Sequence, residues 1–165
     1  MRKYFAELAG TFLMVFIGTG SVILNSLFNN IGQLGIGVSF GIAVSLSIFL
    51  FAKFSGAHIN PAVSIALFFK RQLKSKELLG YILFQLIGAI LASFSLHLLY
   101  PLDSSSLGAT IPSGTWQESF VLELLLTFFL MVIILIVQKK KLGILSSAFI
   151  IGLVVGLEAF FGLSK

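Results

Sequence analysis

Residues 55–64 read Ser-Gly-Ala-His-Ile-Asn-Pro-Ala-Val-Ser and predict a helix start inside an otherwise apolar chain. Asn60 is a good N-cap and Pro61 a good first helical residue, because that position has no intrahelical use for its N–H. The apolar run that follows ends at Lys70. A helix over residues 61–69 would be about 14 Å long at 1.5 Å per residue. It is too short to cross a bilayer of about 30 Å.

The segment before this short helix, residues 55–59, is predicted to be non-helical backbone at membrane depth. Such backbone is tolerated only where protein buries it or where it lines a water-filled cavity. The N-terminus of a half-helix aimed into that cavity carries about +0.5 of an elementary charge. The combination predicts a pore.

The composition places the chain among membrane proteins. Of its 165 residues, 58% are hydrophobic and 10% are charged, whereas soluble domains have about 45–50% and about 25%. The absence of cysteine excludes disulfides and thiolate metal sites. The net charge of +5 does not indicate a nucleic-acid partner, because the basic residues form short clusters between apolar runs. We expect a single membrane channel domain over residues 1–165.

Five apolar runs are long enough to cross the lipid bilayer and predict an all-α integral membrane fold: 4–24, 34–52, 78–99, 120–137 and 142–163. If the N-terminus is cytoplasmic, ten of the eleven Lys and Arg residues face the cytoplasm and only Lys165 does not. This bias favours that orientation. We therefore expect a multi-pass protein of the plasma (inner) membrane.

An internal repeat relates the two parts of the chain. One triplet in the first run recurs in the fourth at an offset of 116: Glu7, Thr11 and Phe12 against Glu123, Thr127 and Phe128. A triplet of small residues recurs between the second and fifth runs at an offset of 111: Gly37, Gly41 and Ser45 against Ala148, Gly152 and Gly156. Small residues at this spacing let helices approach closely in lipid. Because the fourth run starts on the opposite side from the first, the repeats are inverted.

The repeat also predicts which segments are missing. Residues 1–100 form a complete first repeat and residues 118–165 an incomplete second one. The position equivalent to Asn60 is 60 + 111 = 171, beyond Lys165. The second half-helix and the sixth span are therefore expected to be absent, and we expect the 165-residue chain alone to be inactive.

Several motifs give the chain a family resemblance. These are Ala6-Glu7, Gly10-Thr11-Phe12, Gly18-Thr19-Gly20, the Asn60-Pro61-Ala62 segment, Gln85 with Gly88-Ala89, and Gly152-Leu153. The chain resembles the aquaporin and glycerol-facilitator family, also called the major intrinsic proteins. The resemblance implies six spans and two half-helices that meet at Asn-Pro-Ala motifs. It also implies a homotetramer that passes water or small neutral solutes without a cofactor.

The same resemblance implies roles for individual residues. The Asn60 amide, held in the motif with Pro61 and Ala62, donates to a passing water oxygen, and carbonyl groups line the path as acceptors: Gly56, Ala57 and His58. Phe40 and Ala159 match the two sides of the selectivity filter, where alanine in place of histidine would widen the pore. Glu7 and Glu123 match structural carboxylates that accept hydrogen bonds from loop amides.

Two alternatives belong to other functional classes. Residues 37–41 fit the G-x-S-x-G pattern of a serine hydrolase, with Ser39 as nucleophile and His58 or His97 as the base. However, that motif requires a sharp strand-to-helix turn, and here it lies in a helical span. A carboxylate-based secondary transporter would use Glu7, Glu123 and Glu158, because carboxylates inside the membrane are costly and often functional. The pattern assigns no separate role to Glu158.

Overall fold

The computed structural model describes residues 1–101, 107–109 and 114–162. Within these ranges the regular structure consists of six helices: α1 (Arg2–Phe28), α2 (Gly32–Ser55), α3 (Pro61–Phe69), α4 (Ser75–Leu99), α5 (Trp116–Lys139) and α6 (Ile144–Gly162). All except α3 are long and apolar enough to cross a membrane. The all-α membrane class, with five candidate spanning helices and one short helix, is confirmed.

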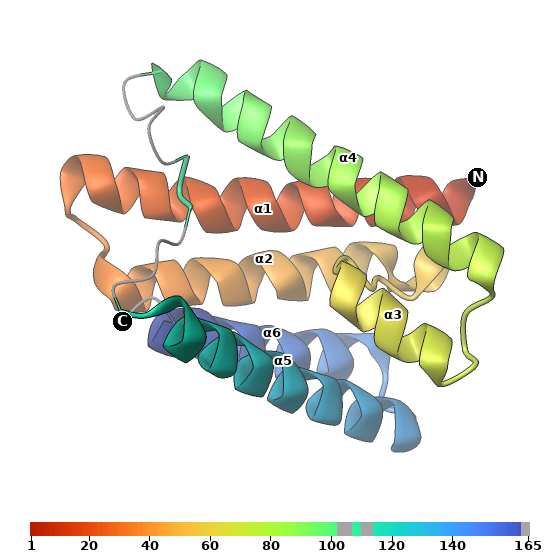
Figure 1. Cartoon of the computed structure of the whole chain (residues 1–165). Coiled ribbons are helices and arrows are strands. Elements are labelled where there is room, and N and C mark those ends of the chain that lie inside the picture. The colour runs from red at the N-terminus through yellow and green to blue at the C-terminus, as the bar shows by residue number, and fades with distance from the viewer. Residues whose placement is uncertain (102–106, 110–113, 163–165) are drawn as a thin grey trace.

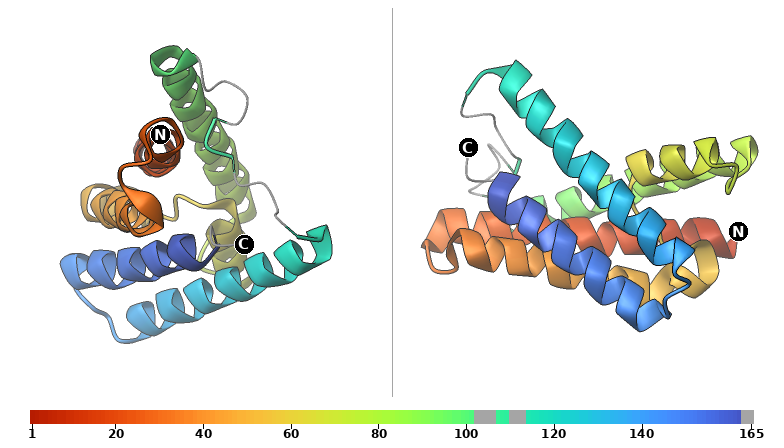
Figure 2. Two further views of the ribbon diagram at one scale, coloured as in Figure 1. Left: turned by 90° about the vertical axis from the view of Figure 1, so that its left-hand side faces the viewer. Right: turned by 90° about the horizontal axis from the view of Figure 1, so that it is seen from below.

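The helices pack around the connection between α2 and α3 (Figures 1 and 2). Helix α2 packs against α1 on one side and α6 on the other, and α4 crosses α1. The short helix α3 contacts both α4 and α5, which come from different parts of the sequence. The break between α2 and α3 is therefore surrounded by long helices.

The ends of α2 and α3 follow their local sequence. Helix α2 stops at Gly56, whose φ of 86° lies in the left-handed region that glycine adopts without steric cost. Helix α3 begins after Asn60, whose side-chain Oδ1 accepts a hydrogen bond from the Ala62 backbone N–H at 2.8 Å. Pro61 occupies the first helical position, as the sequence predicts.

Helices α2 and α6 approach closely because small residues face each other across their interface. A Cβ atom at Gly41 would lie 2.9 Å from the Gly152 carbonyl oxygen, closer than such atoms pack. One turn further towards the end of α2, the Ser45 hydroxyl donates to the Ala148 carbonyl at 3.0 Å. The two small-residue triplets of the repeat thus pack against each other, and dispersion and this hydrogen bond hold the pair in lipid.

We predict that Gly152→Ala destabilises the protein. Alanine in place of glycine inside a helix normally stabilises it by about 1 kcal/mol, but a Cβ at this position would lie 2.5 Å from the Gly41 carbonyl oxygen. The added methyl must push α6 away from α2, and overpacking of this kind costs about 1–3 kcal/mol. The thermal unfolding midpoint of the detergent-solubilised variant should fall. Gly143→Ala is the matched control, since a Cβ there meets no atom within 4 Å; an equal or higher midpoint for Gly152→Ala would contradict the close packing.

Candidate functional site

Residues 56–60 form the non-helical connection between α2 and α3. Ala57 and Ile59 have φ values of 47° and 46°. This left-handed conformation costs a non-glycine residue on the order of 1–3 kcal/mol and persists only when the surrounding structure imposes it. Both side chains are buried. The connection must therefore be held by its neighbours.

The Glu7 carboxylate of α1 is the main support of this connection. Glu7 is fully buried. Its Oε1 accepts a hydrogen bond from the His58 backbone N–H at 2.9 Å, and its Oε2 accepts one from the Ile59 backbone N–H at 2.7 Å. These two N–H groups precede α3 and have no helical partner, so one carboxylate satisfies two donors that lipid would leave unpaired.

A second set of hydrogen bonds joins Glu7 to α3 and α4. The Gln85 Nε2 group of α4 donates to Glu7 Oε2 at 2.7 Å and to Ser64 Oγ at 3.0 Å. Ser64 Oγ also lies 3.1 Å from His58 Nδ1 and donates to the Asn60 carbonyl at 3.2 Å. Three helices and the connection are thus joined through one continuous network.

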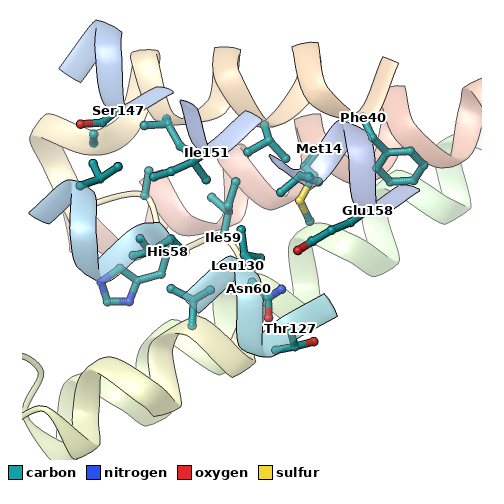
Figure 3. A pocket seen from close by; sticks show the side chains of 18 of the residues that line it. Met14, Phe40, His58, Ile59, Asn60, Thr127, Leu130, Ser147, Ile151 and Glu158 are labelled. Carbon is teal, nitrogen blue, oxygen red and sulfur yellow. The ribbon is translucent and has the colours of Figure 1, made fainter. Parts of the chain in front are cut away.

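A cavity with a volume of about 570 Å³ lies at this connection (Figure 3). Its wall contains the residues that the sequence analysis expected along a path: Gly56, Ala57, His58 and Asn60, with Phe40, Glu123 and Ala159. In Figure 3, Phe40 and Glu158 lie towards one end, His58 and Ser147 towards the other, and Asn60 between them. Pro61 and Ala62 begin α3 and do not line the cavity.

Asn60 combines a structural and a chemical role. Its Oδ1 is used in capping α3, because it accepts the Ala62 N–H. The remaining amide group has two N–H donors, and Figure 3 shows the side chain in the cavity. The positive end of α3 lies at the same place. The site can donate hydrogen bonds to a neutral oxygen and disfavours a cation.

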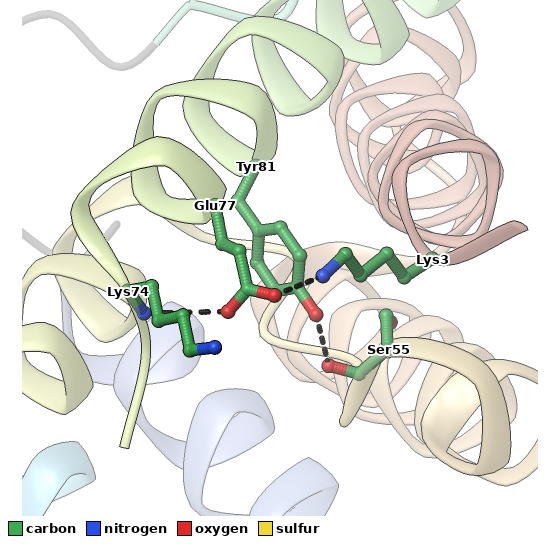
Figure 4. A network of polar contacts seen from close by, with 5 residues as sticks. All are labelled: Lys3, Ser55, Lys74, Glu77 and Tyr81. Atoms are coloured by element: carbon green, nitrogen blue, oxygen red, sulfur yellow. Dashed lines mark hydrogen bonds and ion pairs between the residues drawn. The ribbon is translucent and has the colours of Figure 1, made fainter. Parts of the chain in front are cut away.

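The end of the cavity wall near His58 is tied to α1 and α4 by polar contacts, some of which are drawn in Figure 4. The Tyr81 hydroxyl donates to the Ser55 carbonyl at 2.7 Å, and the Tyr81 ring meets the His58 ring edge-on with centroids 4.9 Å apart. Nearby, the Lys3 ammonium pairs with the Glu77 carboxylate, which joins the starts of α1 and α4. The end of α2 and the connection are thereby fixed to the helices behind them.

The two carboxylates that the repeat makes equivalent have different surroundings. Glu7 lies behind the connection and accepts hydrogen bonds, whereas Glu123 is exposed and lines the cavity. Among the described residues no hydrogen bond to the Glu123 carboxylate is formed. Glu158 lines the same cavity, and its buried Oε1 has no hydrogen-bond partner there. Helices α5 and α6 thus carry carboxylate oxygens without a hydrogen-bond partner among the described residues.

The structure gives no support to the hydrolase or the transporter alternative. Ser39 lies inside α2 and its hydroxyl donates to the Gly35 carbonyl at 2.8 Å, while the His58 ring is engaged with Ser64. Glu7, which a transporter would need to protonate, is fully buried and committed to backbone donors. In the described part of the chain no group of three or more His, Asp or Glu side chains could hold a metal ion.

Sequence reasoning gave no function to several polar residues of the network. Gln85 and Ser64 are almost fully buried and bridge Glu7 to α3, and Tyr81 anchors the end of α2. The sequence did contain a signal for these residues, since polar side chains inside apolar spans cost free energy unless they find hydrogen-bond partners. The partners could not be assigned without the fold.

Comparisons with known proteins agree with this geometry. The family model described as "Major intrinsic protein" matches residues 1–164. The chain is 40% identical over 136 residues to "Glycerol uptake facilitator protein-like 6" of Lactiplantibacillus plantarum, covering 78% of this chain and 59% of that protein. It is 34% identical over 129 residues to "Nodulin-26" of Glycine max, covering 78% of this chain and 48% of that protein. The chain therefore spans about half the length of the curated relatives it matches.

A solved structure extends the similarity to the fold. The aquaglyceroporin from Plasmodium falciparum superposes with a TM-score of 0.83 at 30% sequence identity, covering 99% of this chain and 72% of that one. The half-helix, the break before it and the surrounding spans are thus those of a known fold. The chain belongs to the major intrinsic protein family.

Proposed function

We propose that the protein is a passive membrane channel for water and small neutral solutes of the glycerol type. The observation that carries the proposal is the Asn60 amide in the cavity, at the positive end of a half-helix. The names of its relatives, a glycerol uptake facilitator-like protein and an aquaglyceroporin, support the same substrate class.

The proposed path alternates between acceptors and a donor. The carbonyl groups of Gly56, Ala57 and His58 accept hydrogen bonds from a passing water or hydroxyl group, and the Asn60 amide donates to its oxygen. The half-helix dipole opposes cations, including a proton that hops along water. A neutral solute that has both donors and acceptors can exchange its hydrogen bonds to water for hydrogen bonds to these groups. A cation is repelled by the positive end of the half-helix.

The carbonyl groups of the connection point into the path only while Glu7 holds the connection in place. Its carboxylate binds the backbone N–H groups of His58 and Ile59, and this contact maintains the left-handed conformation at Ala57 and Ile59. We propose that Glu7 acts structurally and that Glu123 has the corresponding role in the second repeat. The repeats proposed are residues 1–100 and 118–165 of one membrane domain.

At the outer end, Phe40 and Ala159 are proposed to form the selectivity filter. Both line the cavity, and the Phe40 ring packs over Gly18, where a Cβ would lie 2.6 Å from Phe40 Cδ1. The small Ala159 side chain leaves room opposite this ring. A wide filter favours passage of glycerol in addition to water.

The cavity has room for more than one water molecule. One water molecule needs only about 10–15 Å³ by this kind of measure, and the cavity has about 570 Å³. We propose that residues 1–165 by themselves insert in a membrane without forming a selective pore.

The proposed cellular setting is the plasma (inner) membrane, with a cytoplasmic N-terminus and a homotetrameric assembly. The charge bias supports this orientation, because basic residues cluster at one end of the helices. The Lys3–Glu77 ion pair places the starts of α1 and α4 at that same end.

The Asn60→Asp variant tests the central proposal. Aspartate keeps an oxygen that can cap α3 but removes both amide donors and adds a negative charge. Water and glycerol flux should fall about fivefold to tenfold, the factor that one lost hydrogen bond supplies, and cation leakage should rise. Light-scattering measurements of osmotic swelling in proteoliposomes of the protein provide the readout. Asn30→Asp, at an exposed position between α1 and α2, is the control; equal flux in both variants would refute the role of Asn60.

A second test concerns the filter. Ala159→His should narrow the space opposite Phe40, so that glycerol passage falls more than water passage. The ratio of glycerol to water permeability in the same proteoliposomes measures the effect. Ala159→Gly keeps the filter wide and should not lower this ratio. Equal losses for the two solutes in Ala159→His would argue against the filter assignment.

Replacement of Glu7 tests its structural role. Glu7→Gln puts an amide donor where one carboxylate oxygen accepts hydrogen bonds, so at least one backbone N–H of the connection loses its partner. The variant should lose about 3 kcal/mol or more of stability, since an unpaired buried group costs about 1–3 kcal/mol and charged partners cost more. Thermal unfolding in detergent should show a lower midpoint together with reduced flux. Glu77→Gln removes only the partly exposed ion pair with Lys3 and should have a much smaller effect; similar midpoints for both variants would contradict the proposal.

A further inference from the structure

A side-chain hydrogen bond joins the beginning of α2 to the end of α6. Gln33 lies in the first turn of α2, and its Nε2 group donates to the Phe160 carbonyl of α6 at 2.7 Å. The contact is partly buried and links residues 127 positions apart. In Figure 1 the start of α2 and the last turns of α6 lie at the same end of the molecule. We call this hydrogen bond the Gln33–Phe160 contact.

The Phe160 carbonyl is a group that needs a partner from outside its helix. It belongs to the last turn of α6, which ends at Gly162. The last four carbonyl groups of a helix have no donor within that helix. A partly buried carbonyl that finds no donor costs free energy. Gln33 supplies the donor, so the contact fixes the end of α6 to α2.

Gln33 is itself held by the turn that precedes α2. Asn29 and Gly32 in this turn have left-handed φ values of 47° and 60°. The Gly32 backbone N–H donates to Oδ1 of Asn25, in the last turn of α1, at 2.8 Å. The start of α2 is thus tied to α1 while the Gln33 side chain reaches α6. Loss of the Gln33 donor would therefore release the end of α6 and leave the start of α2 in place.

Packing alone restrains the end of α6 less completely than this hydrogen bond does. A Cβ at Gly37 of α2 would lie 3.2 Å from the Phe160 Cβ, so the two helices touch here. Contact with a glycine limits how closely α6 approaches α2. A hydrogen bond also restrains rotation and sliding of the helix, because it weakens steeply with distance and angle.

The position of the last turn of α6 determines the width of the proposed filter. Phe40 lies seven residues after Gln33, on the same face of α2, and lines the cavity that contains Asn60. Its ring packs over α1, where a Cβ at Gly18 would lie 2.6 Å from Phe40 Cδ1. Ala159, next to the carbonyl that Gln33 binds, lines the same cavity from α6. A shift of α6 therefore changes the separation of the two filter side chains.

We propose that Gln33 is a positioning residue that sets the solute size limit of the channel. Gln33 does not line the cavity and acts through the Phe160 carbonyl. The contact holds Ala159 at a fixed separation from Phe40, and loss of the contact widens the filter. This role rests on the proposed channel function and on the proposed filter.

A purely stabilising role for Gln33 is the alternative, and Ser45 provides the matched control. The Ser45 hydroxyl donates to the Ala148 carbonyl at 3.0 Å, which is a partly buried hydrogen bond between the same two helices. Ala148 precedes Ala159 by eleven residues, about 16 Å along α6 at 1.5 Å per residue. Ser45→Ala therefore removes an α2–α6 hydrogen bond that lies away from the filter.

Hydrogen–deuterium exchange read by mass spectrometry tests the structural step without any transport measurement. Gln33→Met keeps the length of the unbranched side chain and removes the donor. The backbone amides of residues 157–162 should exchange roughly threefold faster in this variant, the factor that one lost hydrogen bond supplies. Ser45→Ala should leave exchange in residues 157–162 unchanged.

Swelling of proteoliposomes of the protein tests the functional step, with glycerol and the longer polyol erythritol as solutes. The ratio of erythritol to glycerol permeability should rise about threefold in Gln33→Met, because a wider filter admits larger solutes. Ser45→Ala should keep the original ratio. Gln33→Lys should also keep it, since its ammonium group still donates and reaches the carbonyl.

The outcomes separate this inference from the proposed function. Unchanged exchange in Gln33→Met, or faster exchange with an unchanged permeability ratio, would overturn the positioning role while solute passage by the unmodified protein still supports a channel. An equal rise of the ratio in Ser45→Ala or in Gln33→Lys would also overturn it. If the unmodified protein passes neither water nor glycerol, the proposed function is wrong, and the role of Gln33 in selecting solutes is wrong with it.

Discussion

The structure depends on one buried carboxylate. Glu7 of α1 accepts hydrogen bonds from two backbone N–H groups of the connection before α3 and from the Gln85 side chain of α4. At this depth no bulk water is available to replace these acceptors, so a non-helical backbone persists only if protein groups satisfy it. The stabilisation is mutual, because a buried carboxylate is itself costly unless several donors surround it. The half-helix and its support therefore stabilise each other.

Close helix packing makes this arrangement possible. A Cβ at Gly10 of α1 would lie 2.6 Å from Cγ2 of Ile59, so the absence of a side chain there makes room for the connection. The Ser47 hydroxyl of α2 donates to the Gly10 carbonyl at 3.0 Å and holds the two helices at that distance. On the other side of α2, the contact of Gly41 with Gly152 brings α6 close. Small residues thus set the distances on which the polar contacts depend.

The two halves of the internal repeat differ in how completely their polar groups are satisfied. Glu7 has its donors from the connection and from α4, whereas Glu123 and the Oε1 of Glu158 have none among the described residues. Both of these acceptors face the same cavity as the Asn60 amide. The cavity is therefore backed on one side by the hydrogen-bonded network of Glu7, whereas the carboxylates of α5 and α6 on the other side have no hydrogen-bond partner among the described residues.

Some features were predictable because they depend on local sequence. Long apolar runs predict membrane-spanning helices whatever the rest of the fold is. Asn60-Pro61 predicts the start of α3, because helix capping involves only neighbouring residues. The small-residue triplets predicted a close helix contact by their spacing alone. The hydrogen bond from Gln85 to Glu7 was not predictable in this way. It joins residues 78 positions apart, and many side chains lie at such separations.

The sequence by itself determined the membrane class, the five spans and the half-helix, since hydropathy and helix capping act over a few residues. Only the tertiary structure decided which polar groups meet. It placed Ser64 and Gln85 with Glu7 behind the connection, left Glu123 in the cavity despite its equivalence to Glu7 in the repeat, and opened an apolar groove between α2 and α6. The physical reason is that the surroundings of a side chain depend on how distant helices pack, which a local pattern does not specify.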